Sequence, residues 1–445
     1  MESHVFYRAP VKQYPVVAKT EGIYIEDTEG KRYLDGASGC VVANIGYSVP
    51  QVAQAMKEQA QTVSYVHGST FTSRPQEELA RCIAESAPPD LDYVYFVSGG
   101  TEANETAISM ALQYHMQQGN KNKWKIIGRT LSYHGSSLGT LAVASNVARR
   151  RMFSPLILPF PLVPAAHCYR CPLGLEYPGC SIQCAKILEQ TILAEGPDNV
   201  AAFIVEPIIG TSTAAAVPPP EYFPMIRHIC DKYNVLLIAD EVMCGYGRAG
   251  TFTAMEQWQV RPDLFTLGKG LGGGYAPLAA VVAHQKVFEV FKNNWGKFIH
   301  GFTYQGNPVS CAAGLAVYKY LRSERLFEQV AEKGDILAAG LKQLAAKHAI
   351  IGDVRGRGLL LGLELVQNRE RKLSFAKSVQ ASETVKAICM EEGLLLYTGV
   401  GASADVTARD YLVIAPPFII TKEETALLID RLDTALTKAK IRFKD

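Results

Sequence analysis

The chain has 445 residues, of which 48% are hydrophobic, and a formal net charge of +2 at pH 7. This length predicts more than one domain, and the balanced charge argues against a nucleic-acid partner or an acidic tail. The sequence has no apolar run of the ~18 residues that a membrane span needs. Residues 1–15 hold no apolar stretch typical of a signal peptide, so we expect a cytoplasmic protein.

The predicted elements begin with a hairpin. Residues 22–36, GIYIEDTEGKRYLDG, alternate apolar and polar residues on both sides of a turn at 27–30. From about residue 90, helical stretches separate short apolar strands, which we place at 93–97, 125–127, 201–205, 235–239, 264–267 and 278–283. This alternation predicts an α/β fold with a largely parallel sheet that helices cover on both faces.

The last third of the sequence predicts a second, smaller domain. It contains a helical stretch at 315–349, strands at 359–366 and 412–415, and a final helix at 422–440. We expect residues 63–320 to form the large domain, and residues 1–62 to complete a small domain with residues 321–445.

A cysteine-rich segment, HCYRCPLGLEYPGCSIQCA, interrupts the strand–helix alternation. It brings together four of the ten cysteines, Cys168, Cys171, Cys180 and Cys184. Their spacing could ligate a structural zinc ion, although the proline and glycine content also suits an ordinary surface excursion. A site with four cysteine ligands would be closed and not catalytic.

Ligands of open α/β sheets bind beyond the carboxyl ends of the strands, so the residues after each predicted strand are candidates for a site. After strand 93–97, the stretch SGGTEANETAI places Gly100 before Thr101, which we expect to cap a helix. The amides at such a helix start suit a phosphate, although glycine turns of this kind are common without one. Further along, Tyr133 and His134 precede Gly135, and the aromatic ring could lie in the core or flat on a planar cofactor.

Two acids and a lysine follow other strands. Asp240 ends the apolar run VLLIAD and needs either a cation or a capping role if it is buried. An ion pair at ~4 Å and an effective dielectric of about 20 is worth about 4 kcal/mol, enough to keep a weakly basic ring nitrogen protonated. Glu206 ends another apolar strand in the same way. Lys269 stands between two glycines; it is either a solvated side chain or an amine kept from water and nucleophilic toward carbonyls.

A phosphate cradle, an aromatic platform, a carboxylate and an amine together match the needs of pyridoxal phosphate. The chain also resembles the class III pyridoxal-phosphate aminotransferases of fold type I over nearly its whole length. The resemblance lies in YLDGASGCVVANIGYSVPQV, SGGTEANETA, SYHG, EPIIG, LLIADEVMCGYGRAGTF, RPDLFTLGKGLGGGYAPLAAVV, GFTYQGNP and APPFIIT. It implies a large, mostly parallel seven-stranded sheet domain and a smaller α+β domain formed by both termini.

The resemblance also implies a role for each site residue. Lys269 is expected to bind the cofactor as a Schiff base and then to act as the acid–base group. Asp240 pairs with the pyridine nitrogen, Tyr133 stacks on the ring, and Val242 packs on its other face. The amides of Gly100 and Thr101 hold the phosphate, and Thr303 reaches the phosphate of a neighbouring subunit in an obligate dimer. The expected cofactor-binding set is completed by His134, Gly135 and Glu206.

Two positions at which the sequence differs from related aminotransferases predict the substrate. In ornithine and 4-aminobutyrate aminotransferases, a glutamate and an arginine stand where this chain has Thr211 and Val413. We therefore expect an ω-amino acid or amine as donor and pyruvate or 2-oxoglutarate as acceptor, in a ping-pong reaction. Cys40 and Val41 are candidates for the substrate pocket, and Arg409 is a candidate carboxylate clamp or a surface arginine.

Several alternatives remain open at this point. A racemase, an aminomutase or a decarboxylating aminotransferase would use the same lysine and aspartate. A different class of protein is an interaction module organised by zinc, in which the enzyme fold is retained but inactive. The stretch GVGASA at 399–404 has a faint likeness to a dinucleotide loop but lacks a following helical pattern.

Overall fold

The computed structural model describes residues 3–145, 147–400 and 410–443. Its centre is a seven-stranded sheet with the strand order β4-β10-β9-β8-β7-β5-β6. The strands are β4 (Leu91–Val97), β5 (Lys125–Arg129), β6 (Leu162–Val163), β7 (Val200–Val205), β8 (Leu236–Asp240), β9 (Leu264–Leu267) and β10 (Ala279–His284). Neighbours pair in parallel except at β10, which is antiparallel to both β4 and β9. The predicted α/β class with a largely parallel sheet is confirmed.

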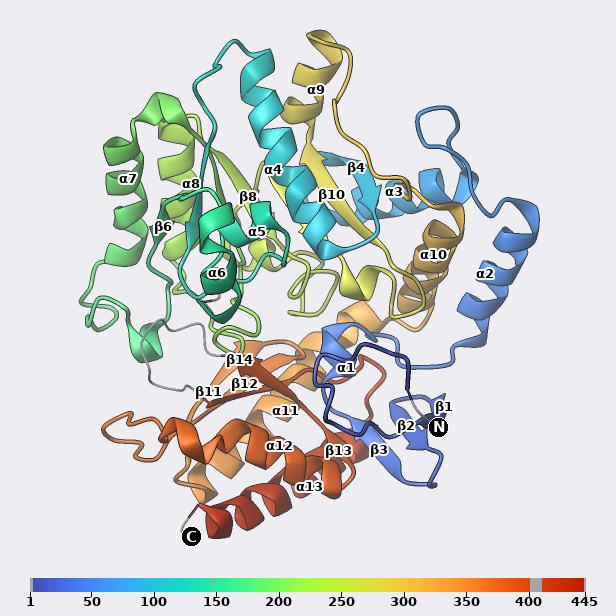
Figure 1. Cartoon of the computed structure of the whole chain (residues 1–445), viewed down its shortest axis with the longest axis vertical. Helices are drawn as coiled ribbons and strands as arrows, with labels where there is room; N and C mark the ends of the chain where they lie inside the picture. Colours follow the sequence, from blue (N-terminus) through green and yellow to red (C-terminus); the bar gives the residue numbers. More distant parts are fainter. Residues whose placement is uncertain (1–2, 146, 401–409, 444–445) are drawn as a thin grey trace.

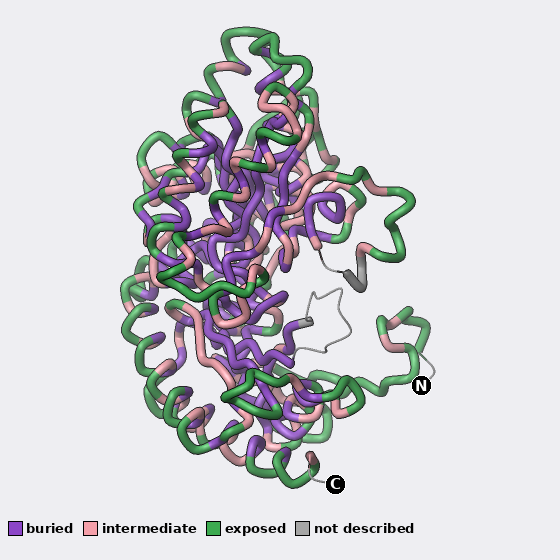
Figure 2. Tube along the Cα trace, turned by 90° about the vertical axis from the view of Figure 1, so that its left-hand side faces the viewer, coloured by how far each residue is buried: buried purple, intermediate pink, exposed green. Residues whose placement is uncertain are grey.

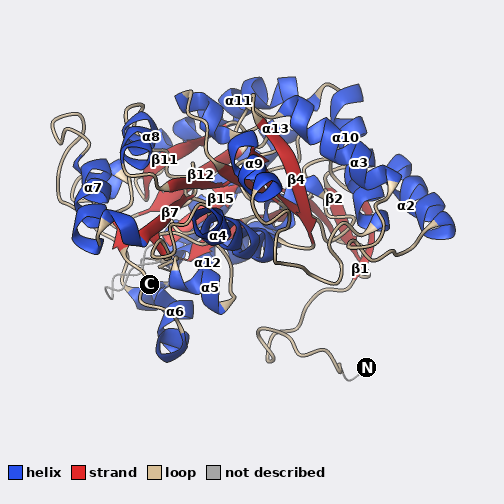
Figure 3. Ribbon diagram, turned by 90° about the horizontal axis from the view of Figure 1, so that it is seen from above, coloured by secondary structure: helices blue, strands red, loops and turns tan. Residues whose placement is uncertain are grey.

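Helices cover both faces of this sheet (Figure 3). Strand β10 shows why: Ala279 and Val281 belong to one hydrophobic core, and Ala280 and Val282 to the other. Successive side chains of a strand point to opposite faces, so a strand that is apolar from Ala279 to Ala283 requires a cover on each side. One face packs on α4 (Gly100–Gln117) and α9 (Gln285–Asn293), and the other on α3 (Arg74–Ser86), α7 (Gln183–Glu195) and α8 (Tyr222–Lys232).

The two ends of the chain meet in a second layer of structure (Figure 1). The predicted hairpin forms β2 (Tyr24–Asp27) and β3 (Arg32–Asp35), with β1 (Val17–Glu21) added at its edge. Strand β13 (Leu394–Leu395) pairs in parallel with β3 and thereby joins the C-terminal part to the N-terminal sheet. A third, antiparallel sheet has the order β11-β12-β15-β14, with β11 (Ile351–Arg357), β12 (Leu360–Leu365), β14 (Tyr397–Val400) and β15 (Asp410–Ile414).

The helical prediction for residues 315–349 was wrong in one respect. The structure has two helices there, α10 (Pro308–Ser323) and α11 (Leu326–Lys347), separated by Arg325 in the left-handed conformation with φ 51°. A non-glycine residue in that region ends a right-handed helix. The remaining helices are α1 (Ser38–Val41), α2 (Pro50–Thr62), α5 (Leu138–Ala142), α6 (Val147–Phe153), α12 (Ala381–Glu391) and α13 (Lys422–Arg442).

Buried residues run through the middle of both layers (Figure 2). Among the described residues, none of the helices combines the length and the apolar character that crossing a bilayer would take. The strands β4, β5, β7, β8 and β9 all run in the same direction, and their carboxyl ends lie along one edge of the large sheet. The residues that follow these strands are the ones that the sequence marked as candidates.

Candidate active site

A cavity of about 250 Å³ opens at this edge of the large sheet. Most of the predicted site residues line it: Cys40, Gly100, Thr101, Tyr133, His134, Gly135, Glu206, Asp240, Val242 and Lys269. Arg8, Asn104, Thr211, Met243 and Tyr397 complete the lining. Residues far apart in the sequence therefore converge on one space.

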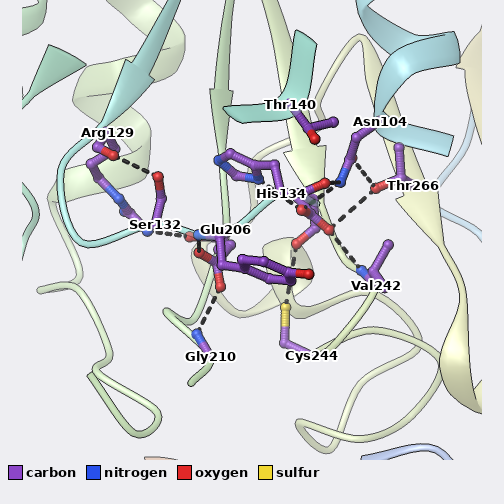
Figure 4. A network of polar contacts seen from close by, with 12 residues as sticks. Asn104, Arg129, Ser132, His134, Thr140, Glu206, Gly210, Val242, Cys244 and Thr266 are labelled. Carbon is purple, nitrogen blue, oxygen red and sulfur yellow. Dashed lines mark hydrogen bonds and ion pairs between the residues drawn. The ribbon is translucent and has the colours of Figure 1, made fainter. Parts of the chain in front are cut away.

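Asp240 is the last residue of β8 and is only 4% exposed. Its Oδ2 accepts hydrogen bonds from His134 Nδ1 at 2.7 Å and Asn104 Nδ2 at 2.8 Å, and its Oδ1 accepts one from the Val242 amide at 3.1 Å (Figure 4). Burial opposes ionisation, but these hydrogen bonds, first that of His134, hold the pKa of Asp240 below its ordinary value. The cavity therefore contains a buried carboxylate whose hydrogen bonds favour the ionised form.

Asn104 and Thr266 belong to this network but were not predicted. Asn104 lies on α4 among the buried alanines, and its amide nitrogen also donates to the His134 carbonyl at 2.8 Å. Thr266 pairs with Asp240 in the β8–β9 register, and its hydroxyl donates to Asn104 Oδ1 at 3.0 Å. A polar residue on the apolar face of a predicted helix was the available signal for Asn104, because a buried amide needs partners.

The start of α4 forms a cradle of bare backbone. Gly99 is the N-cap and no side chain caps the helix, so the prediction of a Thr101 cap was wrong; Thr101 lies in the first turn. A Cβ at Gly100 would stand 2.7 Å from Val242 Cγ1, and one at Gly135 would stand 2.6 Å from Thr101 Oγ1. The cradle can therefore present helix N-terminal amides to an anion at close range.

Glu206 fixes the wall that carries the aromatic ring. Its Oε1 accepts a hydrogen bond from the Tyr133 amide at 2.9 Å, and its Oε2 accepts one from the Gly210 amide at 2.8 Å (Figure 4). Burial raises the pKa of Glu206, and the charge of His134 partly opposes this rise. Glu206 thus orients the backbone of Tyr133, whose ring lines the cavity.

Lys269 follows β9 and begins a short 3-10 turn, Lys269–Leu271. Its φ of 45° lies in the left-handed region, which is strained for a residue with a side chain. Gly268 and Gly270 flank it, and a Cβ at Gly270 would stand 2.9 Å from the Asn44 amide nitrogen. The surrounding structure therefore holds a strained backbone that directs this lysine to the cavity.

Of the other predicted site residues, the structure places one in the lining of the cavity and two outside it. Cys40 lines the cavity, but Val41 does not: its side chain is 3% exposed and packs in the hydrophobic core. Successive residues of the α1 turn point in different directions, which the sequence did not reveal. Thr303 is exposed and lies outside the lining of its own chain's cavity. Arg409 falls outside the described residues.

The four clustered cysteines lie around a second, small cavity with free thiols. Burial and the neighbouring thiols raise the pKa of Cys184 to about 11. Within residues 3–145, 147–400 and 410–443, no three histidine, cysteine or acidic side chains are placed to hold a metal ion. The zinc site remains a prediction from spacing alone.

Comparison with known proteins decides the family. Residues 6–436 match the family "Aminotransferase class-III". This chain is a class III aminotransferase. The enzyme is 39% identical to the uncharacterized aminotransferase YodT of Bacillus subtilis over 430 residues, 96% of each chain. An (S)-enantioselective omega-transaminase structure from Thermomicrobium roseum superposes with a TM-score of 0.90 at 36% identity, covering 97% of this chain and 94% of that one.

The same comparisons establish the fold type and the cofactor. An amine transaminase structure from an uncultivated Pseudomonas species in its PLP-bound form has a TM-score of 0.92 at 29% identity, covering 99% of both chains. The enzyme thus has the predicted fold type I, depends on pyridoxal phosphate, and acts on amines and keto acids. The cavity fits the cofactor: it offers a glycine cradle for an anion, a buried carboxylate for a protonated ring nitrogen, and a lysine.

Proposed function

We propose that this aminotransferase moves an amino group from an ω-amino acid or amine to pyruvate or 2-oxoglutarate by a ping-pong mechanism. The observation that carries the proposal is the substrate side of the cavity, where Cys40 and Thr211 present small, uncharged side chains. The omega-transaminase named above is a structural relative that supports the same class of donor.

We assign the chemistry to residues of the cavity wall. When bound, pyridoxal phosphate supplies an electron-withdrawing ring that stabilises negative charge on the substrate's Cα. Asp240 holds a proton on the ring nitrogen, and the amides of Gly100 and Thr101 bind the phosphate. Tyr133 and Val242 orient the ring from its two faces. Lys269 Nζ removes the proton from Cα and later returns a proton as a general acid.

The class of amino donor is inferred from two charged residues that the substrate side of the cavity does not have. A glutamate at position 211 and an arginine at 413 would form a gate for carboxylates, but the chain has Thr211 at the cavity and Val413 fully buried in β15. An uncharged donor therefore enters without leaving a buried arginine unpaired. This supports amines and ω-amino acids over strict 4-aminobutyrate or ornithine specificity.

The donor and acceptor are tested by screening amines and ω-amino acids against pyruvate and 2-oxoglutarate. Each half-reaction is followed through the absorbance of the bound cofactor. The proposal expects net nitrogen transfer and parallel double-reciprocal plots, the signature of a ping-pong mechanism. Racemisation without an acceptor, or release of carbon dioxide from the donor, would instead assign the enzyme to one of the alternative reactions.

We also propose a homodimer with shared active sites, in which Thr303 reaches the phosphate of the partner's site. The exposure of Thr303 on its own chain supports this role. Mixing inactive Lys269→Ala subunits with impaired Thr303→Asp subunits tests whether the two subunits share their active sites. Hybrids should regain one intact site and activity, whereas sites formed within single chains would show no rescue.

We propose further that the chain has a small domain made of residues 1–62 and 321–445, beside a large domain of residues 63–320. The pairing of β13 with β3 supports this division.

A further inference from the structure

The lining of the active-site cavity contains a cationic side chain that the proposed chemistry does not use. Arg8 lines the cavity from the N-terminal segment. Its guanidinium forms no hydrogen bond or ion pair with any residue in the described part of the chain. The neighbouring charged groups have other partners or tasks: Asp240 and Glu206 accept backbone and side-chain hydrogen bonds, and Lys269 is assigned to the cofactor.

The segment around Arg8 is folded locally. The rings of Tyr7 and Tyr14 stack with centroids 4.8 Å apart, and the Lys12 ammonium lies 5.2 Å from the Tyr14 ring centroid. A backbone hydrogen bond of 3.1 Å from the Lys12 amide to the Ala9 carbonyl closes a turn after Arg8. Most of the segment is exposed (Figure 2), and Arg8 is itself exposed.

The charged side chains of the cavity lie in different parts of its lining. Asp240 and Glu206 lie at the strand ends, where the cofactor is expected to bind. The substrate-side residues Cys40 and Thr211 carry no charge to offset a carboxylate. Arg8 and Lys269 are the arginine and the lysine of this lining, and Lys269 is assigned to the cofactor, so Arg8 is placed to attract an anionic substrate group.

The reaction class requires a site for such a group. Every 2-oxo acid carries a carboxylate beside the carbonyl that receives the amino group, and a carboxylate loses hydration when it enters a cavity. A guanidinium compensates with two parallel hydrogen bonds and a charge. We propose that Arg8 binds the carboxylate of the 2-oxo acid acceptor and thereby sets the preference for acidic acceptors.

This inference rests on the proposed function, because it assumes a 2-oxo acid acceptor. The test compares Arg8→Gln and Arg8→Lys with the wild type and with Lys12→Gln, a control that removes a cation from the same segment but not from the cavity. An uncharged amine serves as donor, and pyruvate and a short aliphatic aldehyde serve as charged and neutral acceptors.

We expect Arg8→Gln to raise KM for pyruvate at least tenfold, with kcat and the KM for the aldehyde within twofold of wild type. Arg8→Lys retains part of the affinity, and Lys12→Gln leaves every constant unchanged. In an assay without turnover, propionate should perturb the absorbance of the bound cofactor, with at least tenfold weaker affinity in Arg8→Gln.

Three outcomes overturn the inference. An unchanged KM for pyruvate in Arg8→Gln would remove the arginine from the site. An equal loss with pyruvate and aldehyde would indicate a general effect of the N-terminal segment. A tenfold effect in a parallel Arg409→Gln variant, with none in Arg8→Gln, would assign the carboxylate to the other arginine. If wild-type enzyme uses neither pyruvate nor 2-oxoglutarate, the proposed function fails, while the propionate titration still reports on Arg8.

Discussion

His134 Nδ1 lies 2.7 Å from Asp240 Oδ2, and both side chains are almost fully buried. Because the carboxylate accepts, Nδ1 carries the proton. His134 Nε2 is buried and has no hydrogen-bond partner among the described residues. The histidine thus acts on the site through Asp240, whose charge and orientation it helps to maintain.

Replacing His134 should therefore weaken the function of Asp240 without removing it. A hydrogen bond to a charged group contributes about 1.5–3 kcal/mol, so we expect His134→Ala to lower kcat/KM about 10- to 100-fold. Stopped-flow measurement of the amine half-reaction gives the rate. Asp240→Asn is the reference for complete loss of the charge and should be more severe; a His134→Ala rate equal to wild type would exclude the positioning role.

Adding one methyl group at the cradle should reduce cofactor affinity. In Gly100→Ala the new Cβ would stand 2.7 Å from Val242 Cγ1, whereas at the adjacent Gly99 it would meet nothing within 4 Å. We expect at least tenfold weaker binding of pyridoxal phosphate in Gly100→Ala, measured by equilibrium titration of the apoprotein. Gly99→Ala is the matched control and should stay within twofold of wild type; equal affinities in the two variants would argue against a tight cradle.

Arg248 should be important for stability. Its buried guanidinium donates to the Leu359 carbonyl at 2.9 Å, the Pro416 carbonyl at 2.6 Å and the Ser38 hydroxyl at 3.2 Å. Burial lowers the pKa of Arg248 to about 9. Arg248→Met removes the donor from both carbonyls and from the Ser38 hydroxyl, and we expect a loss of about 3 kcal/mol or more in the free energy of unfolding.

Thermal unfolding compares this variant with Arg261→Met, which removes an exposed arginine paired with Asp90. An exposed pair contributes at most about 1 kcal/mol, so the control should unfold within a few degrees of wild type. Similar melting temperatures for the two variants would contradict the role given to Arg248.

Glu241 should make stability depend on pH. Burial raises the pKa of Glu241 from 4.5 to about 7, although its carboxylate accepts hydrogen bonds from the amides of Ala254 and Met255. Because the pKa of Glu241 is higher in the folded state than in the unfolded state, its protonation stabilises the folded state. This stabilisation is complete below about pH 4.5 and is lost as the pH rises through 7. The full difference corresponds to about 3 kcal/mol.

Glu241→Gln removes the titration but keeps the shape. The stability advantage of wild type over the variant should shrink between pH 5 and pH 8.5, as measured by denaturant unfolding at each pH. Other groups titrate equally in both proteins and cancel in the difference. Parallel stability curves would show that Glu241 does not titrate in this range.

The sequence predicted elements best where local pattern decides the structure. Strand 264–267 matches β9 in full, and strand 235–239 differs from β8 by one residue at each end. The apolar character of these strands reflects burial on both faces. The pairing of β13 with β3 joins segments at opposite ends of the chain, and the two-residue strand β13 carries no periodic signal of its own.

The residues of the candidate site also differ in how far local sequence pattern predicts them. Asp240, Glu206 and Lys269 could be predicted because each interrupts or ends an apolar run. Arg8 could not, because its place depends on the path of the N-terminal segment. For Asn104 the sequence offered a polar residue on an apolar helix face, but its partners depend on the packing of α4. Val41 was placed in the pocket wrongly, since the turn around Gly39, with φ 68°, directs it into the core.

Reduction of the holoenzyme with borohydride tests the central claim most directly, because it fixes pyridoxal phosphate irreversibly to the lysine that holds it. Mass spectrometry of the digested protein should find the phosphopyridoxyl group on Lys269 alone, and Lys269→Ala should carry no label and show no turnover. A label on a different lysine, or a Lys269→Ala variant that still transfers nitrogen, would contradict the account.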